Sequence, residues 1–421
     1  MSKQKLSLDE LRAAEYDLRL EVSSLERLVY EMDELTDEDD LLERLVMKQQ
    51  TLYEVEQDRA AAEKRNRRSG LIVNAKSESA SEEVGGTDNG SPGTRGADTT
   101  GLVVKVNLRM AQVPTATCHL FDQIEHPLVI SQVRAVGSRK RRVRVISFIE
   151  GYTARAVDTV ELKPNKAQAL YQLPTFFPER IRDLNELTRA TLNILVEDLD
   201  GKVELHATEP VWLLARNSAP LAVKDPTSGQ WNDLTRYLGA FVTPNEPSIM
   251  RFQRQIARHH PEGRLVGYQG PVASQAKAIF QALKQDADIT YVNSVVDFNP
   301  EEGSKTQRVR LPRQSLDEGQ ANCIDGSLLF ASLLEGISLN PAIVIVPKHV
   351  MVGWETKSKS GEWNYLETTM INTHSFEKAL DSGQRKAKVY QGQLEATGNL
   401  QWFRQWSLRE LRTKYGITPL E

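Results

Sequence analysis

The sequence contains only two cysteines, Cys118 and Cys323, in 421 residues. Two cysteines cannot form the disulfide framework of a small secreted protein, and their wide separation matches no spacing of zinc ligands. The sequence therefore predicts no metal site and no cofactor, and each cysteine needs its own explanation. Cys118 lies within the segment 102–224, which is predicted below to form a sandwich, and is interpreted as a buried structural thiol.

Long apolar runs and a large charge of one sign are also lacking. No apolar stretch approaches the roughly 20 residues that span a bilayer, and residues 1–5 lead directly into a charged helical pattern. The formal net charge of −4 gives no general attraction to nucleic acid or to a membrane surface. These absences predict a cytoplasmic protein with neither a nucleic-acid nor a membrane partner.

Residues 1–68 carry the pattern of two amphipathic helices. Ser7 and Glu10 have the spacing of a capping box at the first helix start, and apolar residues recur three, four and seven apart. A break at 36–39 predicts an antiparallel hairpin. Its apolar stripe is covered either by a second copy or partner protein, or by the chain's own domain, and the sequence favours neither interpretation.

Two different patterns follow the hairpin. Residues 69–101 are rich in Gly, Ser, Thr, Asp and Glu, bury too little apolar surface to fold, and predict a disordered linker. From residue 102 the apolar period changes to two, which predicts an immunoglobulin-like β-sandwich over 102–224. Its predicted strands begin at residue 102 and continue at 143–149, 159–162, 191–197, 202–206 and 211–216, with a hairpin turn at Asp200-Gly201.

The strongest basic cluster, Arg139 to Arg144, lies in this predicted sandwich. Such a run can bind nucleic acid or an acidic partner, or can protect a strand edge from aggregation. No aromatic residues suited to base stacking accompany it, so the protective interpretation is favoured.

Helical patterns return after residue 225, at 233–241, 249–259 and 272–283, and a short strand is expected at 289–292. Residues 225–421 are therefore predicted to form an α+β domain. Within it, Asn322 is a favoured N-cap, Asp325 completes a capping box, and Gly336 is the expected left-handed C-cap. Cys323 thus falls in the first turn of a helix, where the helix dipole stabilises a thiolate but Asp325 opposes it.

A histidine and a carboxylate follow on predicted strands. Residues 342–346 read as a buried strand, and His349 opens a hairpin whose return strand carries Glu367. With His349 directly opposite Glu367, the loop is 356–360, and the two Cβ atoms lie roughly 4.5–5.5 Å apart. The carboxylate would then orient the imidazole.

Cys323, His349 and Glu367 together have the logic of a nucleophile, a base and an orienting group. At these residues the sequence resembles the transglutaminase-like superfamily, whose pattern has a glycine before the helix cysteine, a histidine opening a strand, and Trp-x-x-x-Asp on the next strand. Gly319 and Trp363 occupy the remaining positions, and Glu367 replaces the usual aspartate. The resemblance covers about 245–375 and implies a papain/transglutaminase-like fold.

The chemistry that the resemblance implies is thiol-dependent cleavage of an amide in a protein substrate, that is, a cysteine peptidase. The Cys323 amide is the natural oxyanion donor, with Gln320 and Gln314 as side-chain candidates. Two other functions stay open: a transamidase of the same fold, and a binding scaffold with a silent site. Hydrolysis is favoured because the small bacterial-type members resemble peptidases, which is an argument by analogy. The N-terminal modules would deliver the enzyme to a partner.

Overall fold

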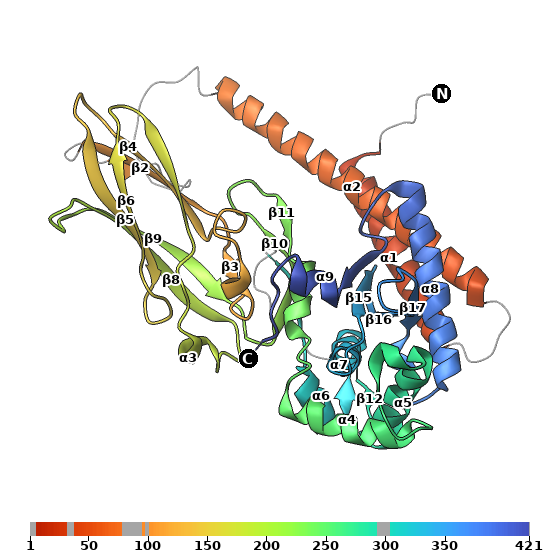
Figure 1. The fold of residues 1–421 in the computed structure, drawn as a ribbon. Coiled ribbons are helices and arrows are strands. Elements are labelled where there is room, and N and C mark those ends of the chain that lie inside the picture. The colour runs from red at the N-terminus through yellow and green to blue at the C-terminus, as the bar shows by residue number, and fades with distance from the viewer. Residues whose placement is uncertain (1–5, 32–37, 78–94, 97–100, 293–303, 421) are drawn as a thin grey trace. The chain divides into compact units, whose positions relative to one another are not determined.

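The computed structural model describes residues 6–31, 38–77, 95–96, 101–292 and 304–420 (Figure 1). The chain divides into two compact units. The described residues of the first unit come from Met1–Asn89, Ile345–Lys348 and Asp381–Arg404, and those of the second unit come from Gly90–Val344, His349–Leu380 and Gln405–Glu421.

The predicted helical hairpin is confirmed in the first unit. Helices α1 (Leu8–Glu31) and α2 (Glu38–Ser77) pack on each other, and Glu10 Oε2 accepts the Ser7 N–H at 2.7 Å, as the capping box predicts. The shared core of the hairpin consists of apolar residues from both helices: Val22, Leu25, Leu42, Leu45 and Leu52.

The apolar stripe of the hairpin is covered in part by a third helix of the same unit. Helix α8 (Phe376–Thr397) joins this unit from Asp381 onward. Val389 of α8 packs against the hairpin core, and the Tyr390 hydroxyl donates to Gln49 Oε1 at 3.2 Å. The sequence left open whether a partner or the chain itself covers this stripe. The contacts of α8 support covering by the chain itself.

The predicted linker 69–101 overlaps two ordered segments. Helix α2 continues past residue 68 to Ser77, and a short strand β1 (Arg95–Gly96) pairs antiparallel with β2 (Leu102–Leu108). The rest of that prediction, residues 78–94 and 97–100, lies outside the described residues.

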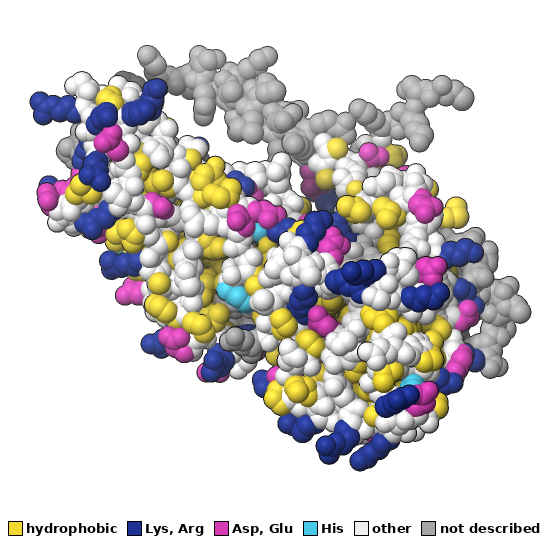
Figure 2. Space-filling view, in the orientation of Figure 1, with side chains coloured by type: hydrophobic (Ala, Val, Ile, Leu, Met, Phe, Trp, Pro, Cys, Tyr) yellow, Lys and Arg dark blue, Asp and Glu magenta, His cyan; other side chains and the backbone are white. Residues whose placement is uncertain are grey.

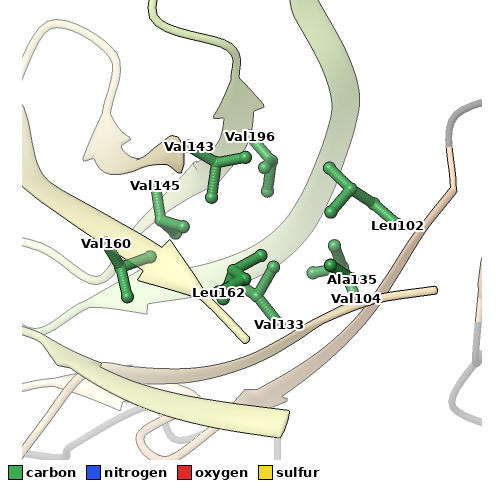
Figure 3. Packing of buried hydrophobic residues seen from close by; sticks show 9 residues of the cluster. All are labelled: Leu102, Val104, Val133, Ala135, Val143, Val145, Val160, Leu162 and Val196. Atoms are coloured by element: carbon green, nitrogen blue, oxygen red, sulfur yellow. The ribbon is translucent and has the colours of Figure 1, made fainter. Parts of the chain in front are cut away.

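Two sheets with one apolar core occupy most of residues 102–224, and their strands pair antiparallel except for β3 with β9. One sheet has the order β1-β2-β4-β7 and the other β3-β9-β8-β5-β6. The further strands are β3 (Gln112–Val113), β4 (Val129–Ala135), β5 (Arg141–Ile149), β6 (Ala156–Leu162), β7 (Ala167–Gln172), β8 (Thr188–Glu197) and β9 (Val203–Leu213). Figure 3 shows side chains from both sheets meeting in this core: Leu102, Val104, Val133 and Ala135 from one sheet, with Val143, Val145, Val160, Leu162 and Val196 from the other. This is the arrangement of a sandwich, and its immunoglobulin-like type stays a prediction.

The prediction of separate strands at 202–206 and 211–216 is wrong, because β9 runs unbroken from Val203 to Leu213. Pro210 lies inside it, and proline cannot donate a ladder hydrogen bond. The strand tolerates Pro210 because β3 pairs only with Trp212 and Leu213 of β9. No neighbouring strand therefore requires a backbone N–H from residue 210 on that side. The predicted turn before β9 is confirmed, with Gly201 at φ 86°.

The basic run of the sandwich is paired with acidic residues. Lys140 contacts Glu161 at 2.9 Å, and Arg141 forms an ion pair with Glu204. The first three residues of β5 pair with β6 alone, so they form a local strand edge of the kind that charged side chains protect. In Figure 2 the sandwich, at the upper left of the view, carries Lys and Arg side chains with Asp and Glu side chains among them.

Residues 225–421 contain helices and small sheets, as an α+β domain requires. The predicted helix at 233–241 is instead a 3-10 helix, η2 (Thr235–Phe241), and the other two are α4 (Pro247–His259) and α5 (Val272–Gln285). The sheet orders are β11-β10-β13, β12-β14 and β17-β16-β15-β18. The strands outside the site are β11 (Trp231–Asp233), β12 (Thr290–Tyr291), β13 (Ser304–Arg308), β14 (Gln320–Ala321) and β18 (Arg404–Ser407), and β11 and β13 pair with β10 (Ser218–Lys224), which precedes this range. The short helices of this range are α6 (Pro312–Glu318), α9 (Leu408–Thr413) and η3 (Gly267–Gln269), whereas α3 (Pro178–Ile181) and η1 (Cys118–Leu120) belong to the preceding residues.

Within the described part of the chain, no helix has both the length and the apolar character that crossing a membrane requires. The same residues hold no group of three or more His, Cys, Asp or Glu side chains placed to bind a metal ion.

The sandwich core can be tested with two substitutions in the same strand. Leu162 of β6 is fully buried, whereas Val157 is 51% exposed. We expect Leu162→Ala to lower the free energy of unfolding by about 2–5 kcal/mol, because it removes buried methyl groups and leaves a cavity. Val157→Ala should stay within about 0.5 kcal/mol of the parent in the same denaturant titration. Equal effects of the two substitutions would contradict the shared core.

Candidate active site

Cys323 is the first residue of helix α7 (Cys323–Gly336). The predicted capping box is confirmed: Asn322 Oδ1 accepts the Asp325 N–H at 2.9 Å, and Asp325 Oδ2 accepts the Asn322 N–H at 3.2 Å. From Ile324 to Leu334 every side chain of α7 is buried, whereas Cys323 is partly exposed. The thiol therefore lies at a rigid helix start that solvent can reach.

Gly336 does not have the predicted left-handed conformation. It is the last residue of α7, and the positive φ of 65° occurs at Ser338 instead. Gly336 has a different role, since a Cβ atom there would lie 2.3 Å from the Gln253 side chain of α4. A side chain at this position would therefore require the end of the Gln253 side chain to move.

The negative charge of Asp325, which was expected to oppose a thiolate at Cys323, has a cationic partner. Asp325 is fully buried, and its Oδ2 lies 3.1 Å from the Arg310 guanidinium, while its Oδ1 accepts the Arg310 N–H at 2.8 Å. Burial raises the pKa of Asp325, and the bonds to Arg310 and Asn322 partly offset that effect. Arg310 thus compensates the carboxylate closest in sequence to the thiol.

His349 opens a strand, as predicted. Strand β15 (Pro341–Val346) and strand β16 (His349–Glu355) are joined by the turn Pro347-Lys348. Lys348 has φ 58°, a conformation that non-glycine residues seldom adopt. A proline followed by a residue of positive φ is the pattern of a type II turn, and this turn fixes where the histidine strand begins.

The predicted register of the following hairpin is wrong by two residues. Strand β17 (Trp363–Leu366) pairs Glu355 with Trp363 and Val352 with Leu366, rather than Glu355 with Gly361. Thr356 N–H bonds to Glu362 O at 2.8 Å in the same register, so the residues between this pair are 357–361 rather than 356–360. A shift of two keeps every side chain on its original face of the hairpin.

The predicted contact between His349 and Glu367 nevertheless forms. His349 Nε2 lies 2.7 Å from Glu367 Oε2. In the observed register the position opposite His349 would be Thr369, so Glu367 is a diagonal neighbour. Diagonal partners are more distant than directly opposed ones and are bridged only by longer side chains. The extra methylene of glutamate, compared with the usual aspartate, suits this geometry.

Glu367 is held by further bonds. It is 1% exposed and caps the short helix η4 (Thr368–Met370), where its Oε1 accepts the Thr369 N–H at 3.2 Å and the Thr369 hydroxyl at 2.7 Å. The His349 side chain retains 22% exposure. The carboxylate is therefore fixed inside the fold, while the imidazole faces an accessible surface.

The charge state of His349 follows from its two partners. Burial lowers its pKa, but attraction to Glu367 and hydrogen bonds to Cys323 and Glu367 outweigh burial and raise the pKa to about 9. Since Nε2 is engaged by Glu367, Nδ1 is the nitrogen left for the Cys323 thiol. At neutral pH the site thus holds an imidazolium between a thiol group and a buried carboxylate.

The two side-chain candidates for the oxyanion hole both have structural partners. Gln314 Oε1 accepts the Leu311 N–H at 2.9 Å, and Gln320 Nε2 donates to Glu318 Oε2 at 2.8 Å. Gln314 also lines a pocket of about 430 Å³. The residues lining that pocket include none of the triad: Arg182, Asp183, Asn185, Arg216, Asn217, Thr243, Glu246, Leu311, Arg313, Gln314 and Leu420. The oxyanion role of either glutamine stays a prediction.

The remaining cysteine is structural, as predicted. Cys118 is 3% exposed, and burial raises its pKa to about 12. Its Sγ donates to Thr115 O at 3.5 Å. A thiol that is buried and protonated at neutral pH is a poor nucleophile, so Cys118 does not compete with Cys323.

Sequence reasoning missed three residues of the site: Arg310, Ser327 and Thr368. Arg310 gives no sequence signal, because its pairing with Asp325 depends on how the segment before α6 folds back onto α7. Ser327 does give one, since it is a hydroxyl residue in a helix that is otherwise largely apolar and lies one turn after Cys323.

Comparison with protein-family models gives no match, and comparisons with curated proteins and with solved structures give none. The resemblance to transglutaminase-like enzymes therefore depends on the order, spacing and geometry of the site residues alone.

The role of Glu367 can be tested by titrating His349 with NMR. We expect the midpoint in the parent protein near the raised pKa of about 9. Glu367→Gln should lower the midpoint strongly, because it removes the attraction that offsets burial. Glu367→Asp should also lower it, because the shorter side chain does not span the diagonal. Assignment uses the resonance that disappears in His349→Gln, and an unchanged midpoint in Glu367→Gln would contradict the buried pair.

The same contact predicts a pH dependence of stability. The folded-state pKa of His349, about 9, lies above the unfolded value of 6.5. Protonation of His349 therefore stabilises the fold fully below pH 6.5, and this stabilisation declines as the pH rises to about 9. We expect the difference in unfolding free energy between the parent and Glu367→Gln to shrink over that interval, as measured by denaturant titration at each pH.

Proposed function

We propose that the chain is a cytoplasmic cysteine hydrolase that cleaves amide bonds in proteins through Cys323, His349 and Glu367. The observation that carries the proposal is the contact of 2.7 Å between His349 Nε2 and the buried Glu367 carboxylate, in an imidazole whose pKa is raised by Glu367 and by Cys323 together. A structural histidine does not require both a buried anion and a partly exposed thiol at a helix start.

The proposed reaction has two stages. In the first stage, the Cys323 thiolate attacks the amide carbonyl carbon, the C–N bond breaks, and His349 gives its proton to the leaving amine. In the second stage, water attacks the resulting thioester, His349 accepts a proton from that water, and the carboxylic acid leaves as the thiolate is restored. Glu367 orients the imidazole and stabilises its charged form throughout.

The charge that develops on the carbonyl oxygen needs hydrogen-bond donors. The N–H of Cys323 is one of the first amides of α7, and such amides have no partner within the helix. It is therefore our proposed oxyanion donor. The helix dipole points the same way, since it favours negative charge at the N-terminus of α7.

A transamidase would use the same acyl-enzyme and replace water with a lysine amine. A silent scaffold would use the fold for docking alone. The raised pKa of His349 and its engagement by Glu367 favour chemistry over docking, because a scaffold has no use for a buried ion pair beside an accessible thiol. The helical unit, and a partner bound through it, would deliver the enzyme to its protein substrate.

The nucleophile can be tested with iodoacetamide and peptide mapping of the native protein. We expect Cys323 to be alkylated rapidly near neutral pH, and Cys118 to react only after unfolding, because Cys118 is buried. Cys118→Ala serves as the matched control and should leave the Cys323 rate unchanged. A native Cys323 that reacts no faster than an ordinary exposed thiol would overturn the proposal.

Activity is measured on a fluorescently labelled unfolded casein and on proteins that co-purify with the chain. We expect Cys323→Ala to lower turnover by about 10³-fold or more, since loss of the nucleophile leaves only binding and oxyanion effects. Mass spectrometry of the products separates the alternatives. New chain termini support hydrolysis, isopeptide links show transamidation, and unchanged turnover in Cys323→Ala would rule out an enzyme that acts through Cys323.

A further inference from the structure

A buried pair of hydroxyl groups lies where the three elements of the candidate triad meet. Ser327 is fully buried in α7, one helical turn after Cys323, and Thr368 is 5% exposed and directly follows Glu367. Their oxygens, Ser327 Oγ and Thr368 Oγ1, lie 3.4 Å apart. Neither residue is part of the nucleophile, base and orienting group.

The Ser327 hydroxyl has two backbone acceptors in its reach. Ser327 Oγ lies 2.7 Å from Cys323 O and 3.2 Å from Val350 O, so its single proton can be donated to either carbonyl, and Val350 is the residue after His349. Thr368 Oγ1 also donates to Cys323 O, at 3.4 Å. The Ser327 and Thr368 side chains thus contact the backbone of Cys323 and of Val350, which follows His349. Thr368 itself follows Glu367.

The close approach of these elements leaves little room for a side chain at Gly326. A Cβ atom at Gly326 would lie 3.0 Å from Thr368 Oγ1 and 3.1 Å from Thr368 Cβ, which is tighter than ordinary contact. A larger residue at Gly326 would require Thr368 to shift by a few tenths of an ångström. Gly326, Ser327 and Thr368 therefore form one packed junction, in which two hydroxyls satisfy carbonyl groups that are otherwise buried between a helix and a strand.

We propose that Ser327 and Thr368 are positioning residues that hold Cys323, His349 and Glu367 in their mutual geometry. The inference rests on the proposed function. The two hydroxyls touch neither the His349 imidazole nor the Glu367 carboxylate. They therefore affect the site by setting the distance between the His349 imidazole and the Cys323 thiol, which would increase if the junction loosened. Catalysis of this kind is sensitive to displacements of about 1 Å.

The chain provides matched controls for both hydroxyls. Ser332 is also fully buried in α7 and also donates to the carbonyl four residues before it, Leu328 O at 2.7 Å, but its other partner is the Thr243 N–H rather than a triad neighbour. Ser332→Ala thus removes an equivalent hydroxyl away from the site. Thr368→Val removes the second hydroxyl with little change of shape, and Thr368→Ser keeps it.

The experiment measures the second-order rate of Cys323 alkylation by iodoacetamide in the full chain, from pH 5 to pH 10. In Ser327→Ala and Thr368→Val we expect the rate near pH 6.5 to fall about tenfold, because the imidazolium no longer holds the thiolate, while the rate at pH 10 stays within about twofold. Ser332→Ala and Thr368→Ser should follow the parent profile. Thermal unfolding of each variant shows how much general stability is lost.

The same variants are titrated by NMR at His349, which is informative even if the protein hydrolyses nothing. We expect the His349 midpoint to fall in Ser327→Ala and Thr368→Val and to stay unchanged in the two controls. A parent-like profile and midpoint in both hydroxyl-deleted variants would overturn the positioning role, and so would an equal loss of rate at all pH values. Failure of the parent Cys323 to react contradicts the proposed function instead, and the His349 midpoints still decide the positioning role.

Discussion

The candidate site depends on one buried contact, between the His349 imidazole and the Glu367 carboxylate. Their nitrogen and oxygen are 2.7 Å apart, and the carboxylate is 1% exposed. A buried carboxylate without partners would be strongly destabilising. Here the histidine, the Thr369 amide and the Thr369 hydroxyl together satisfy it. The contact therefore links strand β16 to the end of β17, and it sets the charge of the base.

The helix that carries the nucleophile is held as firmly as the base. Helix α7 is buried along its length, its start is capped by Asn322, and the charge of Asp325 is balanced by Arg310. Burying the polar side chains of Asn322 and Asp325 is tolerated only where each has a hydrogen-bond partner. The first turn of α7 accordingly has several such bonds. A rigid, charge-balanced helix start leaves the imidazolium as the main influence on the thiol.

The sandwich and the helical hairpin contribute no residue to the triad. Each has its own apolar core, from Leu102 to Val196 in the sandwich and from Val22 to Leu52 in the hairpin. Helix α8 belongs to both units by continuous backbone, since Phe376–Leu380 belongs to the unit that holds the candidate site and the rest of the helix to the unit that holds the hairpin.

Local patterns were sufficient for the long helices α1, α2, α4, α5 and α7 and for strands such as β2, β5, β8 and β15, but not for helix α8 or for strands β4, β7 and β10. The capping box at Asn322, the buried strand before His349 and the period of two in the sandwich all depend on neighbours in sequence, so the sequence alone predicts them. The hairpin register, the continuous strand through Pro210 and the pairing of Arg310 with Asp325 were decided by tertiary packing. Register depends on a turn and on burial that no short segment specifies, and an ion pair or a shared junction such as Ser327 with Thr368 exists only when distant segments meet.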